Sequence, residues 1–275
     1  METALLHEVN NFKTIAHNWE YVLPPSRPSF LELQRIQSLL LGLNRNSDIA
    51  ILGSTAEYRD LLKEQGFSKI YVLDKNKDFY DISKNWCAHD TSYEKLIEGD
   101  WLDTLGGYRN CFDVVLSDLT MGNIDYTLRD EFYGLVSQSL RSGGFFVDKV
   151  LTNELPLIPL SCICDKYLQL PLNLSTANRF SCEALFCSEL LSNEQIDTTV
   201  FYDILRERFS NYPKLLKLIE MSLLITPENC MWYYGKHWNT IERTYIGFYQ
   251  ESPHYIEVPE SPYYGRLRHY FHKKG

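Results

Sequence analysis

The chain has 275 residues, of which 44% are hydrophobic and 23% charged, enough for one large domain with an insertion. It contains no apolar run of about 18 residues that could cross a membrane, and its first residues lack the basic and apolar regions of a secretory signal. The formal net charge of −9 argues against a nucleic-acid partner, because such proteins present a basic stripe to the phosphates. We therefore expect a cytoplasmic protein without a membrane or nucleic-acid partner.

The first 30 residues form an N-terminal segment that two adjacent prolines interrupt. Ser29 is followed three residues later by Glu32, which is the spacing of a capping box at the start of a helix. This spacing predicts a helix that begins after Ser29 and ends near Gly42.

Short apolar runs then alternate with helical stretches as far as about residue 152. The runs that we expect to form strands cover residues 48–52, 69–73, 94–98, 112–116 and, after a turn at 142–144, 145–150. The helices that we expect between them cover residues 57–65, 76–85 and 128–140. This alternation is typical of a parallel sheet that helices cover on both faces.

After residue 152 the alternation stops. Residues 153–240 contain helical candidates such as 199–209 and 212–224 but no regular strands. Two strands are predicted near the end of the chain, at 243–249 and 266–272.

Polar residues and a glycine stand where the first four strands end, which is where open parallel sheets bind ligands. Gly53 lets the backbone approach a ligand, but no second glycine follows, so the loop does not match the dinucleotide fingerprint G-x-G-x-x-G. Asp74 can accept hydrogen bonds from both hydroxyls of a ribose. Asp100 can accept from an adenine amine, with Trp101 as a flat apolar neighbour. Each has a plainer explanation as a turn glycine or a helix cap, but their order on successive strands supports one shared site.

At these residues the sequence resembles the class I S-adenosylmethionine-dependent methyltransferases, over roughly residues 12–152. More narrowly, it resembles a bacterial subgroup whose motifs read L-G-x-T-x-E-x-R, G-D-W and W…PP-x-RP-S, and whose first loop is poor in glycine. The matching segments are Leu52 to Arg59, Gly99 to Trp101, and Trp19 with Pro24 to Ser29.

The resemblance implies an α/β, Rossmann-like fold with a seven-stranded, mostly parallel sheet in the order 3-2-1-4-5-7-6 and an antiparallel last strand. It implies a division into four parts: residues 1–30 covering the cofactor, 31–152 binding it, 153–240 forming an inserted, mainly helical cap, and 241–275 completing the sheet.

The resemblance also implies which residues contact the S-adenosylmethionine cofactor. Asp74 would hold the ribose, Asp118 and Leu119 would pass near the sulfonium, and Arg27 is a candidate for the carboxylate. The complete set is Trp19, Arg27, Gly53, Ser54, Thr55, Asp74, Lys75, Asp100, Trp101, Asp118 and Leu119.

Methyl transfer from a sulfonium is an in-line displacement, which needs a base only if the acceptor must lose a proton. Asp118, by its place at a strand end, and His237 are the candidate bases. The aromatic run from Met231 to Trp238 either forms a cage for a cation or flat ring or, as we favour, packs inside the cap.

We expect no metal. Asp118 and Asp148 could supply two oxygen ligands, but Lys149 beside Asp148 would repel a cation. The seven cysteines lack the spacing of a zinc site and read as free thiols.

The leading hypothesis is O- or N-methylation of a small molecule, with S-adenosylhomocysteine as the product. Methylation of a peptide or protein, and a non-catalytic role as an adenosylmethionine-binding regulator or partner subunit, remain open, as does the choice between monomer and homodimer. Ser117 to Thr120 stand where an N/D-P-P-Y motif would follow the fourth strand, which weakens methylation of base or glutamine amino groups.

Overall fold

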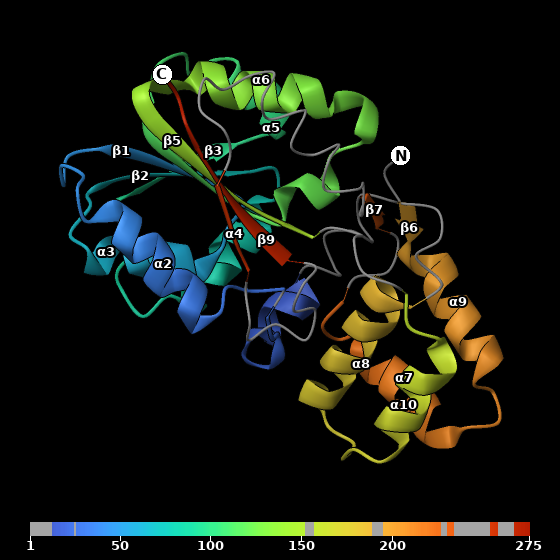
Figure 1. Ribbon diagram of the computed structural model, residues 1–275. Helices are drawn as coiled ribbons and strands as arrows, with labels where there is room; N and C mark the ends of the chain where they lie inside the picture. The colour runs from blue at the N-terminus through green and yellow to red at the C-terminus, as the bar shows by residue number, and fades with distance from the viewer. Residues whose placement is uncertain are drawn as a thin grey trace.

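The computed structural model describes residues 13–24, 26–151, 157–188, 195–226, 230–233, 254–257 and 267–275. Its centre is a seven-stranded sheet in the order β3-β2-β1-β4-β5-β9-β8 (Figure 1). The strands are β1 (Asp48–Leu52), β2 (Lys69–Asp74), β3 (Glu94–Glu98), β4 (Phe112–Asp118), β5 (Leu140–Leu151), β8 (His254–Glu257) and β9 (Leu267–Lys273). The first five are parallel, whereas β9 runs antiparallel to β5 and β8 antiparallel to β9. The predicted fold class and strand order are confirmed.

Helices cover both faces of this sheet (Figure 1). One face carries α2 (Phe30–Leu40), α3 (Ala56–Glu64) and α4 (Lys77–Ser83), and the other carries α5 (Trp101–Leu105) and α6 (Arg129–Ser139). The central strands are apolar on both sides: in β4, Val114 and Leu116 pack in the cluster with α2 and α3, while Val115 packs in the cluster with α6. This double burial is why the strands appear in the sequence as continuous apolar runs.

Helix α2 begins with the predicted capping box. The Ser29 side chain accepts a hydrogen bond from the backbone N–H of Glu32, and the Glu32 carboxylate accepts one from the backbone N–H of Ser29 at 2.6 Å. Glu32 is fully buried, which a capping box alone does not require.

The cap is a second hydrophobic unit, in which helices dominate. It contains α7 (Leu160–Leu168), α8 (Leu174–Cys187), β6 (Gln195–Asp197), α9 (Thr198–Arg208), α10 (Pro213–Ser222) and β7 (Met231–Tyr233). The helices pack on one another around their own core beside the sheet, and β6 pairs antiparallel with β7 (Figure 1). No helix in the described part of the chain is long and apolar enough to cross a bilayer.

Two details differ from the sequence-based expectation. Residues 142–144 do not form a turn before β5, because the strand begins at Leu140 and its pairing with β4 shifts register between Phe112 and Val114. The strand predicted at 243–249 lies outside the described residues. The strand beside β9 is β8, in the stretch between the two predicted strands. β8 spans only four residues between prolines, too few to produce a recognisable period-2 pattern.

Candidate functional site

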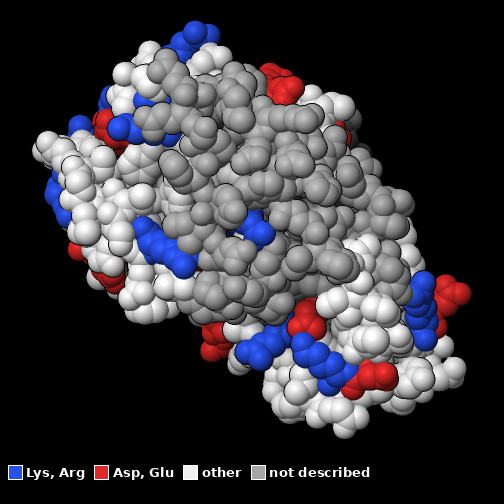
Figure 2. Space-filling view, viewed as in Figure 1, with Lys and Arg blue, Asp and Glu red and all other residues white. Residues whose placement is uncertain are grey.

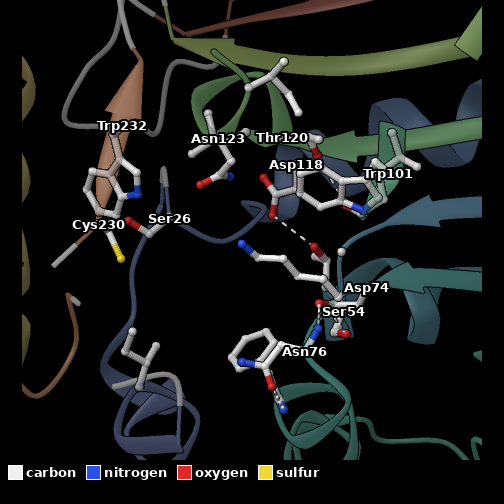
Figure 3. Close-up of a pocket in the computed structure, with 18 of the residues that line it drawn as sticks. Ser26, Ser54, Asp74, Asn76, Trp101, Asp118, Thr120, Asn123, Cys230 and Trp232 are labelled. Atoms are coloured by element: carbon white, nitrogen blue, oxygen red, sulfur yellow. Dashed lines mark hydrogen bonds between the residues drawn. The ribbon is translucent and has the colours of Figure 1, made fainter. Parts of the chain in front are cut away.

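A cavity of about 520 Å³ opens at the carboxyl ends of the parallel strands, between the sheet and the cap (Figure 3). Its volume is within the usual range for small-molecule sites. Three parts of the chain line it: the N-terminal segment, the strand ends of the core, and the cap. Of the predicted cofactor residues, those on its wall are Trp19, Gly53, Ser54, Thr55, Asp74, Lys75, Asp100, Trp101, Asp118 and Leu119.

Asp74, at the end of β2, is held in place before any ligand binds. Ser54 donates a hydrogen bond from Oγ to Asp74 Oδ2 at 2.5 Å, and the backbone N–H of Asn76 donates to Oδ1 at 2.9 Å (Figure 3). Burial raises the pKa of Asp74 from its ordinary value, while these two hydrogen bonds lower it. Because each carboxylate oxygen has two acceptor sites, both can still accept from a diol in the cavity.

The carbonyl of Leu73 in β2 accepts hydrogen bonds from the segments that follow β1 and β3. It accepts hydrogen bonds from the backbone N–H of Gly53 and from Nε1 of Trp101, both at 2.8 Å. Gly53 has a φ of 96°, a conformation that favours glycine, so this position explains the one glycine left in the first loop. Trp101 is thereby fixed with its ring on the cavity wall.

Asp100 has the plainer of its two expected roles, that of a helix cap, and it stands on the cavity wall. Its Oδ1 accepts from the backbone N–H of Leu102 at 3.0 Å and caps α5, while the residue also lines the cavity.

Asp118, at the end of β4, lies near the middle of the site. Thr55 donates from Oγ1 to Asp118 Oδ2 at 3.4 Å on the cavity side (Figure 3). Lys149 Nζ forms an ion pair with Asp118 Oδ1 at 2.9 Å. Burial raises the pKa of Asp118 to about 6 although the Lys149 ammonium lowers it, and the charge of Glu32 adds to the rise. The carboxylate is therefore ionised at neutral pH but close to its titration range.

The residue after Asp118 carries strain. Leu119 has a φ of 58°, in the left-handed region that side chains with a Cβ avoid. Such strain is concentrated at functional sites, and here it turns the chain from β4 along the cavity wall.

The N-terminal segment is tied over the cavity by Glu57 of α3. Glu57 Oε1 accepts from Nε1 of Trp19 at 3.1 Å and forms an ion pair with Nε of Arg27 at 2.9 Å. Trp19 lines the cavity, as predicted, but Arg27 does not. In this structure Arg27 is a partner of Glu57, and its contact with a cofactor carboxylate stays a prediction.

The arginine that ends the L-G-x-T-x-E-x-R motif, Arg59, has a structural role. Arg59 is fully buried on α3, pairs with the Glu94 carboxylate through both Nε and Nη2, and donates from Nη1 to Ser83 Oγ at 2.7 Å. It fixes α3 against β3 and does not contact the cavity.

The cap closes the far side of the cavity. In Figure 3, Cys230 and Trp232 of the segment around β7 lie across the cavity from Trp101. Trp232 packs against the core of the cap, as we favoured for the aromatic run, and it also lines the cavity. His237 and Tyr234, predicted in the same run, lie outside the described residues.

Several wall residues were not predicted. They are Ile15, Val22, Ser26, Leu52, Asn76, Phe79, Gly99, Thr120, Asn123, Ile124, Cys182, Leu185, Ile225, Thr226 and Cys230. Asn76, two residues after the strand-end Asp74, could have been inferred from its position. The cap residues could not, because no strand or motif places them.

The two carboxylates considered for a metal site occupy consecutive rows of the sheet, because Asp148 is in register with Ser117 and Asp118 with Lys149, and each has a different partner. Asp148 is fully buried and accepts from Ser117 Oγ at 2.7 Å, whereas Asp118 pairs with Lys149. Over the residues that the structure describes, no three His, Cys, Asp or Glu side chains are grouped to hold a metal ion.

Comparison with known sequences gives short, partial matches. No family model matches the chain. The polyamine aminopropyltransferase of Hydrogenobaculum sp. (strain Y04AAS1) is 27% identical over 96 residues, which are 32% of this chain and 34% of that protein. The polyamine aminopropyltransferase of Caldicellulosiruptor bescii is 28% identical over 102 residues, 34% of this chain and 37% of that one. The chain thus spans about a third of the length of the curated relatives it matches.

Comparison with solved structures covers nearly the whole chain. A protein of Rhodobacter sphaeroides described as a zinc-dependent alcohol dehydrogenase superposes with a TM-score of 0.57 at 16% identity, over 95% of this chain and 98% of that one. A Listeria monocytogenes protein described as an S-adenosylmethionine-dependent methyltransferase superposes with a TM-score of 0.53 at 15% identity, over 88% and 96%. The chain has the class I methyltransferase fold. Because neighbours with this fold carry different descriptions, the activity has to be argued from the site.

Proposed function

We propose that this protein is an S-adenosylmethionine-dependent methyltransferase that O- or N-methylates a small molecule. The observation that carries the proposal is the Asp74 carboxylate, oriented by Ser54 and Asn76 and facing the same cavity as the ring of Trp101. A carboxylate for a ribose and an aromatic plane for an adenine, at the ends of adjacent strands, fit a nucleoside. The glycine-poor loop after β1 lacks the fingerprint that a dinucleotide pyrophosphate needs.

When bound, S-adenosylmethionine supplies an electrophilic methyl group on sulfur. Asp74 orients the nucleoside, Asp118 stands where the reacting groups meet, and the cap excludes water from them. If the acceptor carries a proton, Asp118 is placed to take it.

The shape of the site supports a small acceptor. The cap side of the cavity is formed by uncharged residues, among them Cys182, Leu185 and Trp232. On the described part of the face in Figure 2, Lys and Arg are interspersed with Asp and Glu and form no continuous basic stripe. We therefore propose a small-molecule acceptor and no nucleic-acid partner. We also propose a cytoplasmic protein that is a monomer or a homodimer, with reduced cysteines such as Cys87 and Cys111.

Aminopropyl transfer to an amine is a second candidate, because two curated relatives carry that name. The donor in such a reaction is a sulfonium nucleoside whose aminopropyl arm, instead of its methyl group, leaves the sulfur. A donor of this kind has no carboxylate, which suits the engagement of Arg27 with Glu57.

Titration calorimetry tests the cofactor and separates the candidates. We expect S-adenosylmethionine and S-adenosylhomocysteine to bind with micromolar affinity and NAD not to bind. Preferential binding of decarboxylated adenosylmethionine would favour aminopropyl transfer, and tight cofactor binding with no transfer to any acceptor would favour a regulatory role. Absence of binding by every nucleoside would overturn the proposal.

Replacing Glu57 by alanine should weaken S-adenosylmethionine binding about tenfold, because it removes both the hydrogen bond from Trp19 and the ion pair with Arg27 that keep the N-terminal segment over the cavity. Calorimetry on the variant measures this. Glu64→Ala, on the same helix but half exposed, serves as the control and should bind like the wild type. Equal affinity of Glu57→Ala and Glu64→Ala would show that the segment does not contribute to binding.

A further inference from the structure

Four ionisable side chains meet behind the cavity, on three adjacent strands and one helix. Asp118 of β4 is paired in register with Lys149 of β5, and Lys149 with His269 of β9, so the three lie side by side across the sheet. Lys149 Nζ is 2.9 Å from Asp118 Oδ1 and 3.1 Å from Oε1 of Glu32 on α2. His269 Nε2 is 2.8 Å from the same Glu32 oxygen.

These side chains are removed from water. Lys149 and Glu32 are 0% exposed, His269 is 1% exposed and the Asp118 side chain 6%. Burying charges is costly unless they compensate one another, and a cation shared by two carboxylates compensates them incompletely. Apolar residues of similar volume often stabilise a core as well as a buried ion pair does, so stability alone does not account for these charges.

The two carboxylates are not equivalent. Burial would raise the pKa of Glu32, but Lys149, His269 and the backbone N–H of Ser29 together lower it to about 2, so Glu32 stays ionised. The neighbourhood of Asp118 is less favourable to its charge. Besides Lys149, it contains the anions Glu32 and Glu57, and burial raises the Asp118 pKa to about 6.

The other ionisable groups that face this cluster do not reverse the difference in pKa between Glu32 and Asp118. Tyr58 of α3 is fully buried and its pKa is raised by burial and by Asp118, so its phenol stays neutral. The pKa of His269 is lowered by burial, so the imidazole is neutral and donates to Glu32. Asp148 points its carboxylate at Ser117 Oγ. Lys149 Nζ also donates to the Arg27 carbonyl at 3.3 Å, which ties the N-terminal segment to the same ammonium.

We infer that Lys149 and Glu32 are positioning residues for Asp118. Lys149 forms an ion pair with Asp118 Oδ1, so that Oδ2, which accepts from Thr55, is directed toward the cavity. Glu32 forms a second ion pair with the Lys149 ammonium and partly neutralises its charge, so that Asp118 remains able to accept a proton. The acceptor then belongs to the class that carries an exchangeable proton, a hydroxyl or an N–H group. In the transfer, the sulfur–methyl bond breaks, the acceptor–methyl bond forms, and the acceptor's proton passes to Asp118 Oδ2. This role in transfer rests on the proposed function, whereas the charge relation between the three residues does not.

The test follows the Asp118 carboxyl itself, in the ligand-free protein. Protein labelled with ¹³C at the aspartate carboxyl carbon is titrated by NMR, and the Asp118 resonance is identified by its loss in Asp118→Asn. In the wild type we expect a midpoint at about pH 6. Glu32→Gln removes a negative charge but keeps an oxygen for the Ser29 N–H, so the midpoint should fall by about one pH unit or more. Lys149→Met removes the positive charge at similar volume, so the midpoint should rise by a comparable amount.

Shifts in opposite directions separate this inference from a merely structural role, which predicts no shift or shifts of one sign. Glu131→Gln, an exposed residue of α6 on the other face of the sheet, is the control and should leave the midpoint unchanged. A wild-type midpoint near the ordinary value of 3.8, or variant shifts of the same sign, would overturn the inference. If Lys149→Met does not fold, the Asp118 midpoint in the wild type and its fall in Glu32→Gln still test the inference. If no nucleoside binds in calorimetry, the proposed function fails while the titration result stands.

Discussion

Arg59→Met should lower the free energy of unfolding by about 3–5 kcal/mol, because it leaves the buried Glu94 carboxylate without its partner. Arg59 and Glu94 are both 0% exposed as side chains, so solvent cannot replace the lost interaction. The change also removes the cation from above the Tyr80 ring, 4.9 Å away, and the donor to Ser83. Denaturant unfolding monitored by circular dichroism measures the loss.

Two comparisons show whether the unpaired charge is the cause. In the double variant Arg59→Met with Glu94→Leu, the apolar pair should recover most of the loss, since a buried ion pair contributes little beyond its apolar equivalent. Lys217→Met breaks an exposed pair with Glu220 and should cost less than about 1 kcal/mol. If the double variant were as unstable as the single one, packing and not charge would explain the effect.

Asp74→Ala should weaken S-adenosylmethionine binding about a hundredfold, or about 3 kcal/mol, because two hydrogen bonds from the ribose to a charged group are lost. Removing the carboxylate also leaves Ser54 Oγ without its acceptor, so the loop after β1 loses its orientation. Calorimetry measures the affinity, and the folded state is checked by thermal unfolding.

The comparison variants make this prediction specific to the ribose. Asp74→Asn keeps one acceptor oxygen and should lose less affinity than Asp74→Ala. Asp103→Ala, an exposed position on α5 outside the cavity wall, should bind like the wild type. Wild-type affinity in Asp74→Ala would place the nucleoside elsewhere and remove the main support for the proposed function.

The role of Lys149 shows the limit of reading residues in isolation. In the sequence it stands next to Asp148 and serves only as an argument against a cation. In the sheet it faces Asp118, from a strand 31 positions further along the chain. The same register places His269 beside it, and α2 brings Glu32.

The sequence alone determined the architecture and the wall of the cavity that the strand ends form. Apolar runs of the right length define the strands, the capping box marks the start of α2, and parallel strands always present their carboxyl ends at one edge. Gly53, Asp74 and Asp118 could therefore be assigned to one site from their positions in the chain.

Tertiary structure decided everything that depends on distance across the fold. Arg27 pairs with Glu57 instead of lining the cavity, the cap wall gathers Cys182, Cys230 and Trp232, and Glu32 serves both a helix terminus and a buried ammonium. These contacts join residues far apart in the chain, and their strength comes from burial, which a local pattern does not encode. The sequence shows which groups stand at the strand ends, and only the packing of the fold shows with which charged groups they form ion pairs.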